Sequence, residues 1–150
     1  MAVARGVSTV VDVSLALLLV SASVATLVAA TPPEREQSRA GARTTAALLA
    51  ATNARIDYRG GNASGTVAGL LADATANDTP DGFRSAVRRR AARTVRTVPV
   101  HGQVTARPVG GGRRIAVGNP PPPSADVDAA AFTVGRNGTP VRVVVRTWSP

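Results

Sequence analysis

The sequence predicts an α+β fold in which an N-terminal transmembrane helix is followed by further helices and then by a small antiparallel β-sheet. Three observations carry this prediction. From Gly6 to Thr31 the chain contains one ionisable residue, Asp12. Between residues 34 and 99, alanine-rich and arginine-rich stretches repeat apolar residues at helical spacing. From His101 onward, short alternating stretches are separated by glycine-containing turns, which is typical of antiparallel hairpins.

Composition limits the chemistry that the chain can perform. Its 150 residues suffice for one domain, and the net charge is +9, from 18 basic and 9 acidic residues. The basic excess lies after residue 30, because Arg5 and Asp12 balance each other before it. There is no cysteine, and His101 is the single histidine. Thiol chemistry, disulfides and a histidine metal cluster are therefore excluded, and we expect neither an enzyme nor a cofactor.

The N-terminal apolar run is long enough to cross a bilayer, which needs about 20 helical residues for a core of ~30 Å. Pro32 and Pro33 then end or kink the helix. A plain signal anchor would need nothing more. A cleaved secretory signal peptide is the alternative, since the small residues 28–30 before Thr31 are typical of a cleavage site.

A third interpretation rests on the stretch Arg5-Gly6-Val7-Ser8-Thr9-Val10-Val11-Asp12. It resembles the class III signal of archaeal type IV pilin-like proteins, haloarchaeal ones in particular. The resemblance implies a leader at 1–6, a transmembrane helix at 7–31 and cleavage between Gly6 and Val7 by a prepilin peptidase. It also implies pilin-like subunits or secretion-platform proteins as partners. Asp12 would pair with a neighbouring subunit during assembly, or else reach the lipid headgroups from near the membrane edge.

The predicted location is the cell membrane, single-pass, with the N-terminus cytoplasmic and the C-terminal domain external. Arg35, Arg39 and Arg43 follow the helix and favour the opposite orientation. Three glycosylation sequons decide for an external domain, since they use three of the few asparagines: Asn62, Asn77 and Asn137.

The rest of the chain divides by pattern into three parts. We expect a juxtamembrane helix at 34–58, a helical part of the external domain at 59–99, and a β-rich part at 100–150 with a proline-rich linker at 120–123. In the last strand, alternation places valines on one face and mostly arginines on the other.

The strongest amphipathic signal in the external part begins at Thr79-Pro80-Asp81, which is typical of a helix start. Arginines flank its narrow apolar stripe, and those proposed to bind an anion are Arg84, Arg88, Arg89 and Arg93. The alternative is a core helix with a solvated basic face. No aromatic residue lies among the arginines to stack on bases, which argues against nucleic acid and favours anionic headgroups or acidic proteins.

No catalytic constellation emerges from the remaining polar residues. Gly110–Gly112 is followed by Arg113 but lacks the lysine of a phosphate loop. On a strand, Asp126 and Asp128 would share a face and could pair for acid–base work or bind calcium, but a polar loop after the prolines is the preferred interpretation. Two hypotheses result. The first is a minor pilin or pilin-like structural component of an archaeal type IV pilus or related secretion apparatus. The alternative is a membrane-anchored or secreted protein that holds an anionic partner on its arginine-rich helix.

Overall fold

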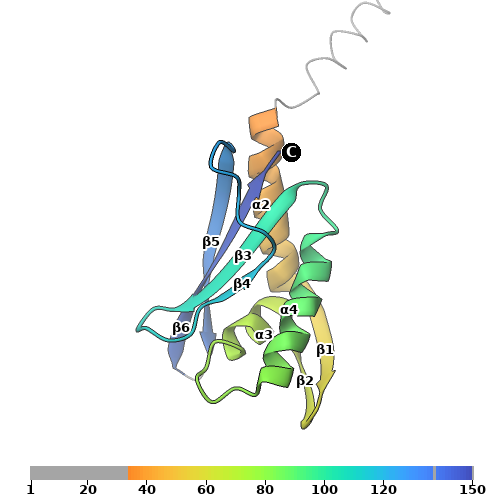
Figure 1. Cartoon of the computed structure of the whole chain (residues 1–150), viewed down its shortest axis with the longest axis vertical. Helices are drawn as coiled ribbons and strands as arrows, with labels where there is room; N and C mark the ends of the chain where they lie inside the picture. Colours follow the sequence, from red (N-terminus) through yellow and green to blue (C-terminus); the bar gives the residue numbers. More distant parts are fainter. Residues whose placement is uncertain (1–33, 137, 150) are drawn as a thin grey trace, which may run out of the picture. The chain divides into compact units, whose positions relative to one another are not determined.

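The structure is a computed structural model that describes residues 34–136 and 138–149. This part of the chain forms three helices and two antiparallel sheets (Figure 1). The elements follow in this order: α2 (Glu34–Ala51), β1 (Asn53–Tyr58), β2 (Gly61–Thr66), α3 (Val67–Asp73), α4 (Asp81–Val95), β3 (His101–Pro108), β4 (Ile115–Val117), β5 (Val127–Arg136) and β6 (Thr139–Trp148). The predicted leader and the predicted span at 7–31 lie outside the described residues.

The predicted fold class is wrong in its order and in its single sheet. The helix expected at 34–58 ends at Ala51, and the helical part expected at 59–99 begins with a strand, because β1 and β2 form a hairpin between the helices. Ala54 and Ile56 are buried while their neighbours are exposed, a two-residue period that overrides any helical tendency. At the turn, Gly60 has φ of 117°, which only glycine adopts readily.

The described residues do not support the membrane-spanning part of the predicted fold. None of their three helices is long and apolar enough to cross a membrane. In place of a membrane-spanning fold, the described residues form three helices and two antiparallel sheets.

The larger sheet has the strand order β4-β3-β6-β5, and all its neighbours are antiparallel. The sheet contains two hairpins, in which glycine-containing turns connect β3 to β4 and β5 to β6. Residues paired across neighbouring strands share a face, so the register assigns every side chain to one of two faces. Val104, Val143 and Val145 lie on the inner face and are buried.

The helices cover this inner face and complete the core. From α2, Ala42, Thr45 and Leu49 form a buried stripe at helical spacing, and the helix lies against β5 and β6 (Figure 1). Leu71 of α3 and Val87 of α4 are fully buried in the same core. One continuous core thus holds the helices on one face of the larger sheet and leaves its outer face without a helix.

The outer face is covered at one end only. Because β4 and β5 are opposite edges of the sheet, the proline-rich segment 118–126 has to cross it (Figure 1). At the end of the sheet where β3 begins, Gln103 and Trp148 lie on the outer face and are nonetheless buried. The His101 ring stacks on Trp148 with centroids 6.2 Å apart. Arg107 and Arg142 lie exposed on the opposite half of this face.

Candidate anion-binding face

Two arginines face each other across the two central strands of the larger sheet. Arg107 on β3 is the cross-strand partner of Arg142 on β6, and both are exposed. Arg146 lies four residues further along β6 on the same face, and Arg114 immediately precedes β4. We call these four residues the arginine face: Arg107, Arg114, Arg142 and Arg146.

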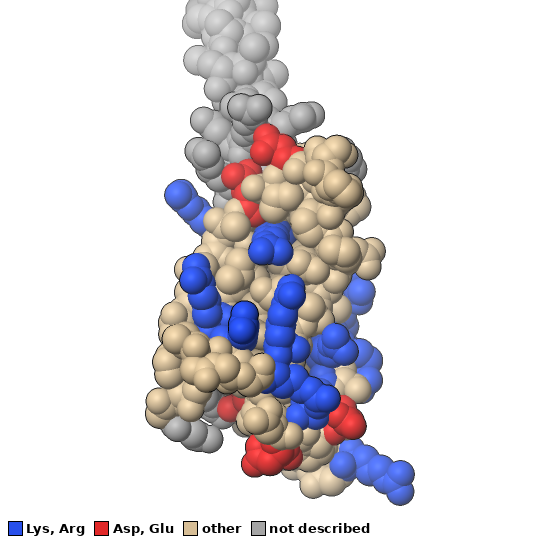
Figure 2. Space-filling view, turned by 60° about the vertical axis from the view of Figure 1, so that its left-hand side comes forward, with Lys and Arg blue, Asp and Glu red and all other residues tan. Residues whose placement is uncertain are grey.

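These arginines surround a wide depression of about 720 Å³ on the outer face of the sheet. Thr105 and Val144, which are cross-strand partners, form its floor, and Pro108 and Val109 line one side. Figure 2 shows several arginine side chains spread over the face in view. The volume falls in the range of ligand-binding clefts, roughly 300–1,000 Å³.

Within the part of the chain that the structure describes, no carboxylate neutralises the charges of the arginine face. The neighbours of Arg142 across the strands are Arg107 and Thr133, and those of Arg146 are Gln103 and Ala129. Within residues 34–136 and 138–149, no ion pair joins any of the four to a carboxylate. Like charges directly opposite each other destabilise an antiparallel pair, so this arrangement costs stability in the absence of an anion.

The four arginines predicted to bind an anion all lie on α4, but they differ in exposure and in hydrogen bonding. Arg84 turns inward, and its side chain is only 11% exposed. Its guanidinium donates to three carbonyl oxygens that follow α3, those of Ala74 at 3.3 Å, Ala76 at 2.8 Å and Asn77 at 3.1 Å. It also contacts Asp81 at 2.9 Å. Arg84 therefore holds the α3–α4 connection against α4. Little of its side chain is exposed to contact the anion that the sequence predicts it to bind.

Arg88 is tied to the edge of the larger sheet. Its Nε and one terminal nitrogen donate to the carbonyl oxygen of Ala116 in β4, at 3.2 and 3.1 Å. Arg89 and Arg93 are exposed on α4, and no hydrogen bond of theirs is recorded within the described residues. Of the predicted set, these two remain the ones most available to a partner.

The other predicted site residues are spread over the chain. Asn62 is exposed in the β1–β2 hairpin, and Asn77 is exposed between α3 and α4, so both sequons are accessible. Gly6, Val7, Asp12 and Asn137 lie outside the described residues. Asp126 precedes β5, whereas Asp128 lies within it, so the two carboxylates do not share the face of one strand. The described residues contain no cluster of three acidic or histidine side chains that could hold a metal.

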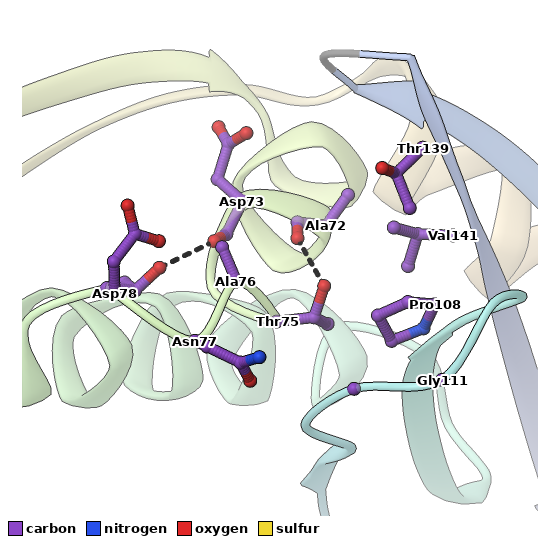
Figure 3. A pocket seen from close by; sticks show the side chains of 12 residues that line it. Ala72, Asp73, Thr75, Ala76, Asn77, Asp78, Pro108, Gly111, Thr139 and Val141 are labelled. Carbon is purple, nitrogen blue, oxygen red and sulfur yellow. Dashed lines mark hydrogen bonds between the residues drawn. The ribbon is translucent and has the colours of Figure 1, made fainter.

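A second depression, of about 380 Å³, lies where the α3–α4 connection meets the larger sheet (Figure 3). Pro108, Thr139 and Val141 face the connection across it. Two of its hydroxyls already donate hydrogen bonds, that of Thr75 to the Ala72 carbonyl at 2.7 Å and that of Thr79 to the Asp73 carbonyl at 2.9 Å. Both bonds stay within α3 and the connection that follows it.

The arginine face was half visible in the sequence. Alternation marks Arg142 and Arg146 as one face of a strand, whereas Arg107 and Arg114 join them through strand register, which local sequence does not encode. A family model described as "Family of unknown function (DUF7284)" matches residues 11–142. The chain belongs to this family. No curated protein matches the chain. The match covers three of the four arginines and leaves out Arg146, so the central pair of this DUF7284 member lies within the family's domain.

Proposed function

We propose that the described domain is a binding module that holds an anionic partner on the arginine face. One observation carries the proposal: Arg107 and Arg142 lie directly opposite each other with no acidic residue beside them in the ladder. Guanidinium groups bind carboxylate and phosphate oxygens through paired hydrogen bonds. An anion bridging the two would relieve their mutual repulsion and gain charge-assisted hydrogen bonds at once.

The same proposal moves the binding surface from the predicted helix to the sheet. Arg84 and Arg88 donate to main-chain carbonyls, which leaves their guanidiniums fewer donors for a partner. The sheet arginines converge on a depression, whereas Arg89 and Arg93 project from a convex helix surface. A concave site surrounds more of a ligand than a convex one and excludes more water from each contact.

The test is retention of the full chain on a heparin column, in non-ionic detergent because residues 13–30 carry no charge. The Arg107→Gln/Arg142→Gln variant should elute at clearly lower salt than the wild type. The matched control is Arg89→Gln/Arg93→Gln, which removes the same two charges from α4. Elution of both variants at the same salt would contradict the proposal, since net charge alone would then explain retention. Earlier elution of the α4 variant alone would favour the helix hypothesis.

The pilin-like structural role stays a prediction, because Arg5–Asp12, which carry it, lie outside the described residues. Its test is independent of the arginine face. Mass spectrometry of the mature chain should find Val7 at the N-terminus, and a chain that begins at Met1 or Thr31 would contradict it.

A further inference from the structure

The positive charges of the arginine face continue around the edge of the sheet. Arg114 lines the depression on the outer face and also a third depression, of about 350 Å³, which lies against α4. Arg88 and Arg113 line this third depression as well. We call the five residues from the centre of the sheet to α4 the arginine track: Arg142, Arg107, Arg114, Arg113 and Arg88.

The first three arginines of the track form a row across the strands. Arg107 is paired with Arg142, and Arg114 comes directly before Ile115, the partner of Ala106. Extending that register by one residue places Arg114 level with Arg107. Neighbouring strands lie about 4.8 Å apart, so the row spans about 10 Å before it reaches the edge.

The fourth and fifth arginines carry the track over the edge. Arg88 donates to the Ala116 carbonyl, so its guanidinium lies at β4. The side chain of Arg113 is 56% exposed, and one of its terminal nitrogens lies 3.9 Å from a carboxylate oxygen of Asp81. Asp81 is the single carboxylate that lines the third depression. The track therefore turns from the face of the sheet toward the helix layer within a few residues.

We propose that the arginine track binds an extended acidic peptide segment of a partner protein, which lies across the sheet and turns over the β4 edge; this rests on the proposed function of the arginine face. A flexible chain can follow such a turn. Duplex DNA is stiff over about 150 base pairs and cannot, and a lipid surface would meet one side of the edge only.

The apolar surface beside the track also favours a peptide. Val109 is 64% exposed at one side of the depression, and Val144 lies on its floor. Apolar side chains that alternate with carboxylates would contact both, which a polyphosphate cannot do. Among the described residues, every phenylalanine, tyrosine and tryptophan is buried or half-buried, so none offers a platform for stacking bases.

The experiment compares labelled peptides in which glutamate alternates with alanine. A peptide of about four residues reaches ~13 Å, enough for the row alone, and one of about twelve residues reaches ~40 Å, enough for the whole track. Binding to the full chain is followed by fluorescence anisotropy. A glutamine–alanine peptide of each length serves as the uncharged control.

The long peptide should bind more tightly than the short one, and the variants should separate the two parts of the track. Arg113→Gln should weaken the long peptide by about threefold and leave the short one unchanged, whereas Arg142→Gln should weaken both. Asp81→Asn should tighten the long peptide, because it removes the competing carboxylate.

Three outcomes would overturn the proposal. Equal affinity of the two peptides, with both sensitive to Arg142→Gln, would reduce the track to the arginine face and leave the proposed function standing. Tighter binding of single-stranded RNA or of anionic vesicles than of the long peptide would show that the occupant is wrong. Insensitivity of every ligand to Arg142→Gln would remove the proposed function as well.

Discussion

Arg107 on β3 lies directly opposite Arg142 on β6, at the centre of the larger sheet and on the face that no helix covers. Antiparallel partners have Cβ atoms about 4.5–5.5 Å apart, so the bases of the two side chains are held close by the backbone. The two long side chains can point their guanidinium groups away from each other, which reduces the repulsion between the charges but does not remove it. Stability and the proposed anion binding therefore impose opposite demands on this pair.

We expect Arg142→Thr to stabilise the protein by about 0.2–1 kcal/mol while it weakens anion binding. The substitution removes the repulsion with Arg107 and introduces a β-branched residue opposite Thr133, which suits a central strand. Urea denaturation measures the stability, and retention on heparin measures the binding.

The matched control is Arg146→Thr on the same strand and face. Arg146 is paired with Gln103 and Ala129, so its removal relieves no opposing charge. Its free energy of unfolding should change by less than Arg142→Thr changes it. An equal gain from both would mean that strand propensity, and not repulsion, is responsible.

We expect Arg84→Met to lower the free energy of unfolding by about 2 kcal/mol. The guanidinium donates to three carbonyl oxygens after α3 from a side chain that is 11% exposed, and methionine keeps the apolar stem but none of the donors. Denaturation in urea measures the loss. Arg89→Met on the exposed side of the same helix should stay within about 0.5 kcal/mol of the wild type. If the two variants lose equal stability, the inward role of Arg84 is wrong.

We expect Gly118→Ala to destabilise the protein by about 2–5 kcal/mol, because two costs add. Its φ is 89°, and a Cβ there would overlap the carbonyl oxygen of Gly102. Gly111 supplies the comparison: its φ is 95°, yet a Cβ would meet nothing within 4 Å. Gly111→Ala should therefore cost only about 1–2 kcal/mol, the backbone part. Thermal unfolding of the two variants separates the costs, and similar melting temperatures would show that the crossing segment can shift.

The sequence predicts the elements whose periodicity is strong and local. The last strand and its tight turn, and the apolar stripe of α4, follow from patterns of a few residues. The start of α4 at Asp81 agrees with the Thr79-Pro80-Asp81 signal, but its physical basis differs. Pro80 occupies the N-cap without a side-chain hydrogen bond, and the Thr79 hydroxyl donates to the Asp73 carbonyl instead. A threonine at a helix start usually caps it with its hydroxyl, but this hydroxyl is used within the α3–α4 connection.

The hairpin β1–β2 was missed because its residues are weak strand formers. Residues 61–66 are Gly, Asn, Ala, Ser, Gly and Thr, which carry no apolar alternation. They pair because β1 supplies the apolar side chains and α4 packs against β1, with Tyr58 and Phe83 in an edge-to-face contact at 5.3 Å. The candidate site was half missed for a similar reason. Arg107 lies opposite Arg142 only because β3 pairs with β6 and not with β5. The topology of the whole sheet determines this pairing.

We expect Thr45→Val to raise the free energy of unfolding by about 1 kcal/mol. Thr45 is fully buried on the face of α2 that packs on the sheet, and its hydroxyl oxygen has no hydrogen-bond partner within the described residues. Valine has nearly the same shape, so the core keeps its packing while the cost of burying an unpaired hydroxyl disappears. Urea denaturation of the full chain measures the gain, and Thr44→Val, on the exposed side of the same helix, is the control. A loss of stability from Thr45→Val would show that the hydroxyl is satisfied in solution, and that a polar group on α2 helps to position the helix on β5 and β6.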